Sequence, residues 1–412
     1  MLKYWLWLAT RRGLGKNGAL AVLRQFGTPE AAFYADEAAI RSLEFLKKPE
    51  SLLDKDMREA EEILRLCYQK NIHILTFADA AYPERLRNID DPPLLLYYQG
   101  VIPAIDTEPV IAMVGTRKAS AYGLLQAKQL GYQLGKLGAV VVSGGAAGID
   151  TLALKGALTA GRPVMAVLGC GCDVDYPRQN HDLFEDIRRH GCLLSEYPPE
   201  TPPLPEHFPV RNRILSGIAL GVLVVEAPKR SGALNTAHHA YNQGRDLFAV
   251  PGNVGIATCA GNLQLLKEGA GVVEEGWDVM KEYVHLYPEL VSPQPKTVPM
   301  ELNGDDLRTA EKPEKREPVV AENAEVPEKS DRKTVDKPKR KAYIDVQEIL
   351  PKLSPDEKSI VELLADAPLH IDLIIDGTQL SAGRVLAAMT MLELKGYVRR
   401  LPGRVFGLAE QE

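Results

Sequence analysis

Two short turns, each placed directly after an apolar segment, carry the residues best suited to bind a ligand. Gly115-Thr116-Arg117 follows residues 110–114, and Ser143-Gly144-Gly145 follows Val140-Val141-Val142. Glycine lets the backbone approach a ligand closely, and the free N–H groups at the start of a helix attract an anion. We therefore expect both turns to bind a phosphate or another anion.

Two further segments add cations and another helix start. Arg211 and Arg213 flank Asn212 shortly after Phe208, and Ser231-Gly232 opens a predicted helix. A guanidinium group holds a phosphate through two parallel hydrogen bonds. Either arginine taken alone is also compatible with a surface salt bridge. That alternative weakens if all four segments meet in one place.

The elements that must position these segments are predicted from residue 109 onward, where short apolar runs alternate with helical segments. The predicted strands are 110–114, 139–143, 164–168, 192–195, 221–226 and 247–250. This alternation is typical of an α/β fold with a Rossmann-like, mostly parallel sheet covered by helices on both faces. Ligands of such sheets bind at the carboxyl ends of the strands, which is where all four segments fall.

Other kinds of site are not indicated. Neither glycine turn has the GxGxxG pattern of a dinucleotide fold or the Gly-Lys-Ser/Thr ending of a P-loop. His207, His238 and His239 have no nucleophile motif beside them. Cys170-Gly171-Cys172 lacks the spacing and the second cysteine pair of a zinc site. We therefore predict a protein that is not an enzyme, with no catalytic residue, no metal and no cofactor.

The flanking segments predict further modules. Residues 1–70 have helical spacing, with Thr28 placed to cap a helix that starts at Pro29, and form a small helical module of the helix-hairpin-helix or SAM-like kind. Residues 71–108 read as a connector to the Rossmann-like domain at 109–287. Residues 288–343 are predicted to form a disordered charged linker, because 18 of the 31 residues in the stretch 311–341 are charged. Residues 344–412 predict a winged-helix domain with three helices, the third capped by Ser381, and a hairpin that turns at Pro402-Gly403. The third helix has few basic groups beyond Arg384 and Lys395, which favours a protein contact or weak DNA binding over sequence-specific DNA binding.

Composition limits the protein class. The 412 residues are 45% hydrophobic and 25% charged, with a net charge of −6, so a polyanion would have to bind locally rather than through a global field. The five cysteines fit a reducing compartment. Residues 4–9 are too short for a secretory signal, and no apolar run reaches the roughly 18 residues of a membrane span. These observations predict a cytoplasmic protein with no membrane contact.

The order of the motifs resembles the DNA-processing protein A family, also called Smf. The resemblance rests on Gly115-Thr116-Arg117, the loop from Ser143 to Asp150, the Phe208–Arg213 segment, the Ser231-Gly232 turn and Val250-Pro251-Gly252, spread over about 160 residues. It implies a single-stranded DNA binding protein of natural transformation that protects incoming strands, forms a homodimer and helps to load the RecA recombinase.

The resemblance also implies the residues of the site. These are Gly115, Thr116, Arg117, Ser143, Gly144, Gly145, Phe208, Arg211, Asn212, Arg213, Ser231 and Gly232. Arginines and helix starts take phosphates without reading sequence, and Phe208 is able to stack on a base. In this sequence Thr116 stands where the family commonly has Ser, Ala147 stands at a common Arg position and Leu154 replaces a common His. The loss of that arginine would weaken phosphate contact.

Two alternatives remain open. The Ser143-Gly144-Gly145 turn is also similar to that of small-nucleotide enzymes of the lysine-decarboxylase-like phosphoribohydrolase type, although their Pro-Gly-Gly-x-Gly-Thr motif is replaced here by Val250-Pro251-Gly252-Asn253. Leu263 and Leu266 are predicted to lie at the homodimer face, but leucines on a helix are more often part of a core.

Overall fold

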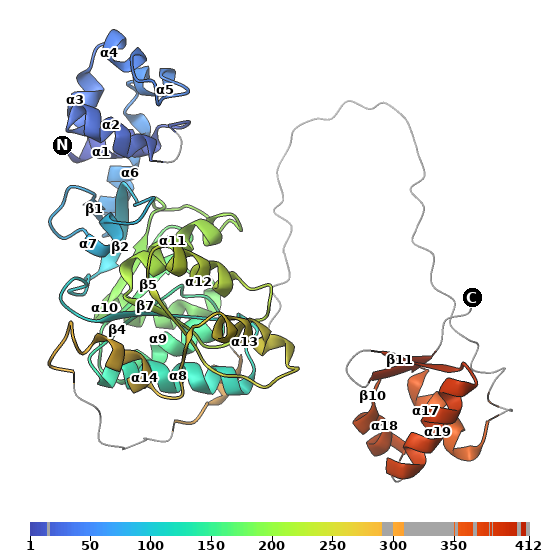
Figure 1. Ribbon diagram of the computed structural model, residues 1–412. Coiled ribbons are helices and arrows are strands. Elements are labelled where there is room, and N and C mark those ends of the chain that lie inside the picture. Colours follow the sequence, from blue (N-terminus) through green and yellow to red (C-terminus); the bar gives the residue numbers. More distant parts are fainter. Residues whose placement is uncertain are drawn as a thin grey trace, which may run out of the picture. The chain divides into compact units, whose positions relative to one another are not determined.

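The computed structural model describes residues 1–14, 17–290, 300–308, 350, 353–365, 369–378, 380, 382–401 and 405–408. The chain divides into two compact units, Met1–Lys315 and Arg316–Glu412 (Figure 1). The first unit contains all the site residues predicted above. No helix in these ranges has both the length and the apolarity needed to cross a membrane.

A sheet of nine described strands forms the centre of the first unit, in the order β1-β2-β6-β5-β4-β3-β7-β8-β9. The seven strands from β6 to β9 in that order run parallel, which confirms the predicted α/β fold. The strand bounds are β1 (His73–Thr76), β2 (Leu95–Gly100), β3 (Val110–Val114), β4 (Val140–Ser143), β5 (Val164–Leu168), β6 (Cys192–Ser195), β7 (Gly221–Val224), β8 (Asp246–Ala249) and β9 (Gly271–Val272).

The segment predicted as a connector contributes two of these strands. β1 pairs with β2, and β2 pairs with β6, both antiparallel. Residues 71–108 therefore extend the same sheet to which the predicted Rossmann-like domain contributes. The extended pieces were visible in the sequence, but their partner strand β6 lies about a hundred residues away, and local pattern carries no information about that pairing.

Helices cover both faces of the sheet, and alternate residues of each strand pack on opposite sides. Ile111 and Met113 pack with α8, α9, α10 and α14, whereas Val110 and Ala112 pack with α11, α12 and α13. Figure 1 shows the two groups on opposite sides of the strands. The bounds are α7 (Glu84–Arg87), α8 (Ala121–Lys136), α9 (Ile149–Thr159), η1 (Arg178–Asn180), α10 (His181–His190), α11 (His207–Ile218), α12 (Gly232–Asn242), η2 (Ala257–Cys259), α13 (Ala260–Lys267), α14 (Gly276–Met280) and η3 (Lys281–Tyr283).

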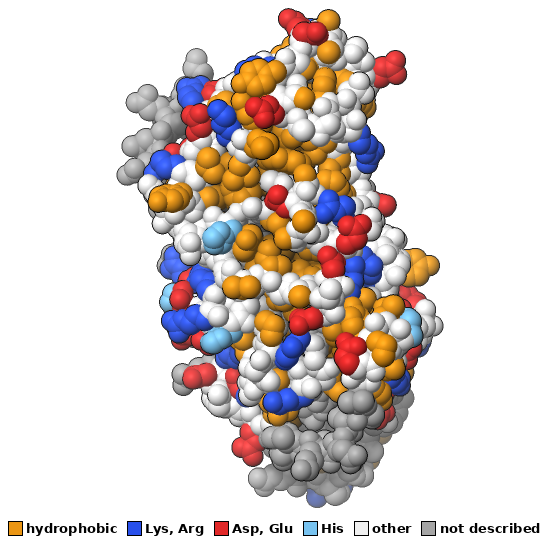
Figure 2. Space-filling view, turned by 90° about the vertical axis from the view of Figure 1, so that its left-hand side faces the viewer, with side chains coloured by type: hydrophobic (Ala, Val, Ile, Leu, Met, Phe, Trp, Pro, Cys, Tyr) orange, Lys and Arg blue, Asp and Glu red, His pale blue; other side chains and the backbone are white. Residues whose placement is uncertain are grey.

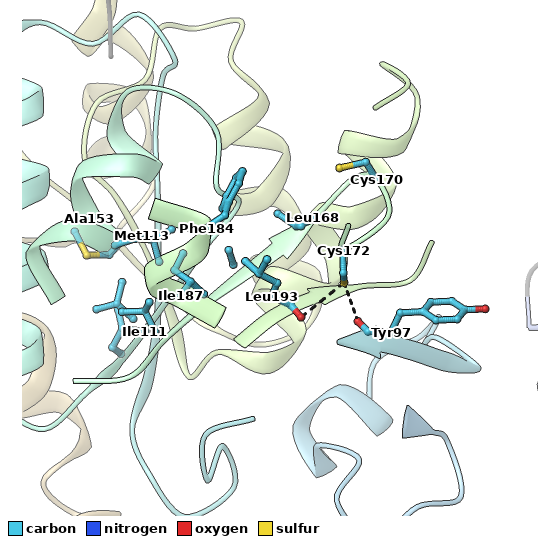
Figure 3. Close-up of a cluster of buried hydrophobic side chains, with 14 of the residues drawn as sticks. Tyr97, Ile111, Met113, Ala153, Leu168, Cys170, Cys172, Phe184, Ile187 and Leu193 are labelled. Atoms are coloured by element: carbon cyan, nitrogen blue, oxygen red, sulfur yellow. Dashed lines mark hydrogen bonds between the residues drawn. The ribbon is translucent and has the colours of Figure 1, made fainter. Parts of the chain in front are cut away.

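The buried cluster on the first face reaches the β2–β6 junction (Figure 3). There the Cys172 thiol donates to the carbonyl oxygens of Tyr97, at 3.3 Å, and Leu193, at 3.7 Å. All five cysteines of the chain are buried and unbridged. Burial raises the pKa of the Cys170 thiol to about 12, so this thiol is an inert core group at neutral pH.

Six short helices form the N-terminal module: α1 (Leu2–Thr10), α2 (Gly18–Phe26), α3 (Pro29–Tyr34), α4 (Glu37–Arg41), α5 (Glu50–Leu53) and α6 (Arg58–Gln69). The Thr28 side chain accepts a hydrogen bond from the Ala31 N–H, which confirms the predicted cap. Trp7 is fully buried, and its indole N–H donates to the Asp54 carbonyl oxygen at 2.9 Å. This bond joins α1 to the loop before α6.

The side of the molecule on the left of Figure 1 faces the viewer in Figure 2. Hydrophobic side chains gather there among scattered side chains of both charges. Between the N-terminal module and α7, this unit has a hollow of about 550 Å³ whose apolar lining includes Trp5, Leu20, Leu23, Phe77 and Ile89. Mixed charge around it gives no continuous cationic surface for a nucleic acid.

Part of the predicted linker packs against the first unit. Residues 300–308 include α15 (Gly304–Arg308), whose Asp306 carboxylate is buried and lies 2.7 Å from the Lys128 Nζ atom and 3.4 Å from the Lys155 Nζ atom. The prediction that residues 288–343 are disordered is therefore wrong for residues 300–308, whose order depends on lysines that lie about 150 to 180 residues earlier in the chain. The charged stretch 311–341 lies outside the described residues.

The second unit holds α17 (Pro355–Leu364), α18 (Ile371–Thr378), α19 (Ala382–Leu394) and an antiparallel sheet of β10 (Leu369–His370), β12 (Val405–Leu408) and β11 (Val398–Leu401). This confirms the predicted winged-helix pattern. Arg384 and Lys395, the basic residues singled out on the third helix, pair with Asp356 at 2.6 Å and Glu357 at 2.7 Å. The predicted cap Ser381 and the turn Pro402-Gly403 lie outside the described residues.

Candidate nucleic-acid-binding site

A pocket of about 570 Å³ lies at the carboxyl ends of β3, β4 and β7. Eight of the twelve predicted site residues line it: Gly115, Thr116, Arg117, Phe208, Arg211, Asn212, Ser231 and Gly232. The other four, Ser143, Gly144, Gly145 and Arg213, do not line it and are buried. The pocket therefore brings together the Gly115-Thr116-Arg117 turn, part of the Phe208–Arg213 segment and the Ser231-Gly232 turn. The fourth segment, Ser143-Gly144-Gly145, lies behind the pocket.

Close backbone packing joins the first two turns. Gly148 has a φ of +80°, and a Cβ atom placed on it would lie 2.6 Å from the Thr116 carbonyl oxygen. A Cβ atom on Gly115 would lie 2.5 Å from the Ile149 side chain. Glycine is needed at both positions, since any side chain would push the Arg117 turn away from the start of α9.

The polar side chains of the turns fix the backbone around the pocket. The Thr116 hydroxyl accepts a hydrogen bond from the Lys118 N–H at 3.2 Å, a role that serine fills equally well. The Ser231 hydroxyl caps α12 by accepting from the Ala233 N–H at 3.2 Å. The first turn of α12 therefore faces the pocket and is favourable for an anion.

Arg211 lies in the wall of the pocket, with only 4% of the residue exposed. Its guanidinium donates to the carbonyl oxygens of Gly144, at 2.9 Å, and Val167. Burial lowers the pKa of Arg211 to about 10, and burial raises the pKa of Asp150, against the opposing effect of the Arg211 charge. Arg211 thus holds the Ser143–Gly145 turn and contributes positive charge from behind the pocket surface.

Arg213 points away from the pocket into a paired site. Its guanidinium makes two hydrogen bonds with the Glu196 carboxylate, at 2.7 and 2.8 Å, and its Nε donates to the Asp91 carbonyl oxygen at 2.9 Å. The Asp91 carboxylate lies 3.2 Å from the same nitrogen. Arg213 therefore forms a salt bridge, which is the alternative that the sequence left open. The paired side chains are largely buried, whereas the alternative placed them on the surface.

The Ser143–Gly145 turn is held by hydrogen bonds from behind. The Ser143 hydroxyl donates to the Met113 carbonyl oxygen at 2.6 Å, and the Gly144 N–H donates to the Asp150 carboxylate at 3.1 Å. The Asn180 amide donates to the Gly145 carbonyl oxygen at 2.9 Å. The Ser143 hydroxyl and the Gly144 N–H, which the sequence predicts to bind a ligand, are therefore bonded to groups within the protein.

Phe208 is the aromatic surface of the pocket. The Arg117 guanidinium lies 5.0 Å from the centre of its ring, and the Tyr176 ring packs against it at 5.6 Å between ring centres. A guanidinium over an aromatic ring is a favourable cation–π arrangement. Arg117 and Phe208 together offer a cation and a flat apolar surface in the same pocket.

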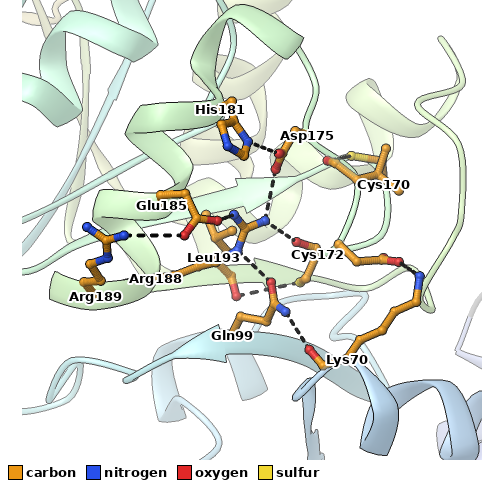
Figure 4. Close-up of polar contacts among 12 residues, drawn as sticks. Lys70, Gln99, Cys170, Cys172, Asp175, His181, Glu185, Arg188, Arg189 and Leu193 are labelled. Atoms are coloured by element: carbon orange, nitrogen blue, oxygen red, sulfur yellow. Dashed lines mark hydrogen bonds and ion pairs between the residues drawn. The ribbon is translucent and has the colours of Figure 1, made fainter.

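A polar network holds the loop that carries Tyr176 (Figure 4). At its centre, Arg188 donates to Glu185 at 2.6 Å, Asp175 at 3.0 Å, the Cys172 carbonyl oxygen at 3.2 Å and Gln99 at 2.9 Å. Gln99 in turn donates to the Lys70 carbonyl oxygen at 2.9 Å. The end of α6, β2, α10 and the loop before η1 are therefore tied together beside the pocket. The two carboxylate oxygens of Asp175 are both used in this network, one by His181 and the other by Arg188.

Two further cations at the pocket were missed by the sequence analysis. Lys118 and Arg230 both line the pocket and are exposed, as is Arg117. Among the described residues, none of the three has a carboxylate within salt-bridge distance. The signal was present in the sequence, since Lys118 follows the first turn and Arg230 precedes Ser231, but only the fold shows which cations lack partners.

Two of the three histidines that lie near these turns, His207 and His238, have partners within the first unit. The His207 ring stacks on Tyr197 at 4.0 Å between centres, and its Nδ1 lies 3.1 Å from the Gly169 carbonyl oxygen. The His238 Nε2 atom is 3.1 Å from the Asn242 amide. Within the described ranges, no three His, Cys, Asp or Glu side chains are grouped so that they could hold a metal ion.

Comparison with known proteins places this arrangement in a family. The family model described as DNA recombination-mediator protein A matches residues 73–284, and a model of the DprA winged helix domain matches residues 347–404. The chain is 32% identical to Protein Smf of Synechocystis over 406 residues, which cover 97% of each chain. The chain belongs to the DprA/Smf family.

Two comparisons with Streptococcus pneumoniae agree with this membership. The chain is 42% identical over 205 residues to the protein named DNA processing protein DprA, covering 50% of this chain and 72% of the relative. The X-ray structure of DNA processing protein A from the same organism superposes with a TM-score of 0.61 and 34% identity, and the match covers 68% of this chain and 98% of the solved chain. The shared fold therefore includes the sheet that carries the pocket.

Two residues that depart from the DprA/Smf pattern, Ala147 and Leu154, do not line the pocket. Leu154 lies on α9 with its side chain fully buried in the core. Ala147 is half-buried and does not line the pocket, although Ala146 does. The pocket keeps Arg117, Lys118 and Arg230 as cations without an arginine at position 147.

The two leucines predicted at a dimer face lie on α13. Leu263 and Leu266 are half-buried, and Leu266 packs against the core on the α11–α13 side. Beside α13 there is an open hollow of about 1010 Å³, lined by residues that include Leu234, Tyr241, Phe248 and Leu265. Their place at a dimer face stays a prediction.

Proposed function

We propose that this member of the DprA/Smf family binds single-stranded DNA in the pocket at the carboxyl edge of the sheet. The observation that carries the proposal is the set Arg117, Lys118 and Arg230. These are three exposed cations with no carboxylate partner in the part of the chain that the structure describes, around a pocket that also contains Phe208. Unpaired cations attract backbone phosphates, and an aromatic ring stacks on a base without reading its identity. This combination suits a single strand, whose bases are free to leave the stack.

The predicted site residues then take two roles. Arg117, Phe208, Ser231 and Gly232 face the strand, together with the backbone of Gly115 and Thr116. Arg211, Asn212 and the Ser143–Gly145 turn shape the wall of the pocket through the hydrogen bonds described above. Arg213 stabilises the loop around Asp91 and does not contact phosphate in this proposal.

The proposal extends to the cellular role that membership of a recombination-mediator family suggests. The protein protects incoming strands in natural transformation, acts in the cytoplasm as a homodimer, and helps to load the RecA recombinase without catalysing a reaction. The dimer is tested by Leu266→Glu, which should shift the protein to a monomer in light scattering. A variant that stays dimeric would remove α13 from the interface. Loading is tested by RecA filament formation on strands coated with a single-strand binding protein, with and without this protein.

The binding experiment is fluorescence anisotropy of a labelled 30-nucleotide strand and of the same sequence as a duplex, over a salt series. We expect tighter binding to the single strand and an affinity that falls with salt. Each phosphate contact on a single strand contributes about 0.7 to the slope of log K against log salt. The triple variant Arg117→Gln, Lys118→Gln and Arg230→Gln should therefore reduce the slope by about 2.

A matched control removes a cation far from the pocket. Lys47 is exposed and lies in the N-terminal module, so Lys47→Gln should leave both affinity and slope unchanged. An unchanged slope in the triple variant would overturn the site. A pocket of about 570 Å³ also accommodates one nucleotide, which keeps the small-nucleotide enzyme as a second candidate. Release of free base from nucleoside monophosphates, together with no preference for the single strand, would favour that candidate.

A further inference from the structure

Three large exposed apolar side chains lie on, or against the start of, the loop that leads to the pocket residue Thr258. Val254 is 90% exposed and Ile256 is 49% exposed, both on the loop between β8 and η2, and Tyr122 near the start of α8 is 49% exposed. The Tyr122 hydroxyl donates to the Pro251 carbonyl oxygen at 3.4 Å, which places this ring against the start of the loop. Exposed apolar groups gathered in this way are typical of a contact surface.

The loop is continuous with the pocket. Thr258 lines the pocket, and Ile256 and Val254 precede it by two and four residues. Since consecutive Cα atoms are about 3.8 Å apart, the two side chains start within roughly 8 and 15 Å of the Thr258 Cα atom. Stacked bases rise by about 3.4 Å each, so this span corresponds to at most about four bases next to the pocket.

The chemistry of the loop suits bases better than phosphates. No charged residue occurs from Leu247 to Leu266, a run of twenty residues that includes the whole loop. The loop therefore offers no side-chain charge to a phosphate and no ion pair to a protein partner. Gly255 lies between the two aliphatic residues with a φ of +89°, and a Cβ atom on it would meet nothing within 4 Å, so the tip is open to solvent.

We propose that Val254 and Ile256 form an apolar platform for the bases that flank the nucleotide held at Phe208. The cations of the pocket bind the backbone on one side, and the uncharged loop covers base faces on the adjoining side. This inference rests on the single-strand binding proposed above and adds a second contact region, which determines how many nucleotides the protein covers.

The test compares two 20-unit strands in anisotropy experiments. One is dT20, and the other has a single thymidine at its centre and abasic units elsewhere. The wild-type protein should bind dT20 more tightly. The double variant Val254→Ser and Ile256→Ser should weaken dT20 binding roughly three- to tenfold, the effect expected when two aliphatic side chains lose an apolar contact. Its affinity for the single-base strand and its salt slope should match those of the wild type.

The control is Tyr68→Ser with Val101→Ser, which removes two exposed apolar side chains of the same unit, on α6 and after β2. It should bind both strands as the wild type does. Equal losses on both strands, an unchanged affinity for dT20, or a similar loss in the control would each overturn the platform. A change in oligomeric state with dT20 binding intact would assign the loop to a contact between copies and overturn it too. Failure of the wild-type protein to bind either strand would instead refute the proposed function.

Discussion

Replacement of Arg213 distinguishes most clearly between a structural role and a role in DNA binding. The sequence placed it beside Arg211 as a phosphate ligand, whereas the structure pairs its guanidinium with Glu196 and Asp91. The Arg213 side chain is only 9% exposed, and that of Glu196 is 26% exposed. Replacing Arg213 with Gln would leave the Glu196 carboxylate without its two charged hydrogen bonds in a partly desolvated place.

The expected cost follows from that burial. Breaking a fully buried ion pair costs about 3–5 kcal/mol, and the remaining exposure of Glu196 and Asp91 reduces this to about 2–3 kcal/mol. Arg213 lies in the unit Met1–Lys315, and an unfolding entropy of about 2.1 cal/mol/K per residue means that about 1 kcal/mol shifts the Tm of such a unit by about 1.5 °C. Arg213→Gln should therefore lower Tm by roughly 3–5 °C. Its salt slope for single-stranded DNA should equal that of the wild type, because no phosphate contact is lost.

The assay measures Tm by calorimetry and the salt slope by anisotropy on the same preparations. Lys118→Gln is the matched comparison, with an unchanged Tm and a slope reduced by about 0.7. Glu196→Gln should destabilise the protein as Arg213→Gln does, and the double variant should lose less than the sum of the two, since both remove one interaction. If Arg213→Gln kept the wild-type Tm and reduced the slope by about 0.7, the assignment of Arg213 to a structural pair would be refuted.

Two further predictions concern the turn behind the pocket and the loop beside it. A Cβ atom on Gly144 would lie 2.6 Å from both the Arg211 Nη2 and Asp150 Oδ2 atoms. Gly144→Ala should therefore lower the free energy of unfolding, measured by chemical denaturation, by about 1–3 kcal/mol. The control is Gly232→Ala, which should leave that free energy unchanged because nothing lies within 4 Å of a Cβ atom there. The hydrogen bond of 2.5 Å to Asp175 raises the pKa of His181. The stability that this bond contributes is complete below the ordinary histidine pKa of about 6.5, and it is lost as the pH rises through the pKa of His181 in the folded protein. The Tm difference between wild type and His181→Gln should therefore be larger at pH 5.5 than at pH 8, and a difference that grows with pH would contradict this.

The sequence predicted the sheet well because its signals are local. The strand at 110–114 and the cap at Thr28 depend on residues next to them, and both lie where the pattern placed them. The attachment of β2 to β6 and the packing of α15 on α8 depend on partners far along the chain, and the sequence analysis missed both. For the same reason it found the turns of the pocket and did not find which cations stay unpaired.

The basic residues in and behind the pocket show why burial, and not residue type, decides which of them are free to bind a ligand. Arg211 and Arg213 lie on α11, whose last eight residues are buried between the sheet and α12. The Arg211 guanidinium donates to backbone carbonyl groups, and the Arg213 guanidinium pairs with carboxylates of the same chain. Arg117, Lys118 and Arg230 lie on turns that project beyond the strands, where no acidic side chain of the described residues reaches them. In the proposed binding mode, a phosphate would therefore be attracted by the second group without breaking any pair in the first. The first group keeps the pocket in shape before the ligand arrives, which lowers the ordering cost of binding.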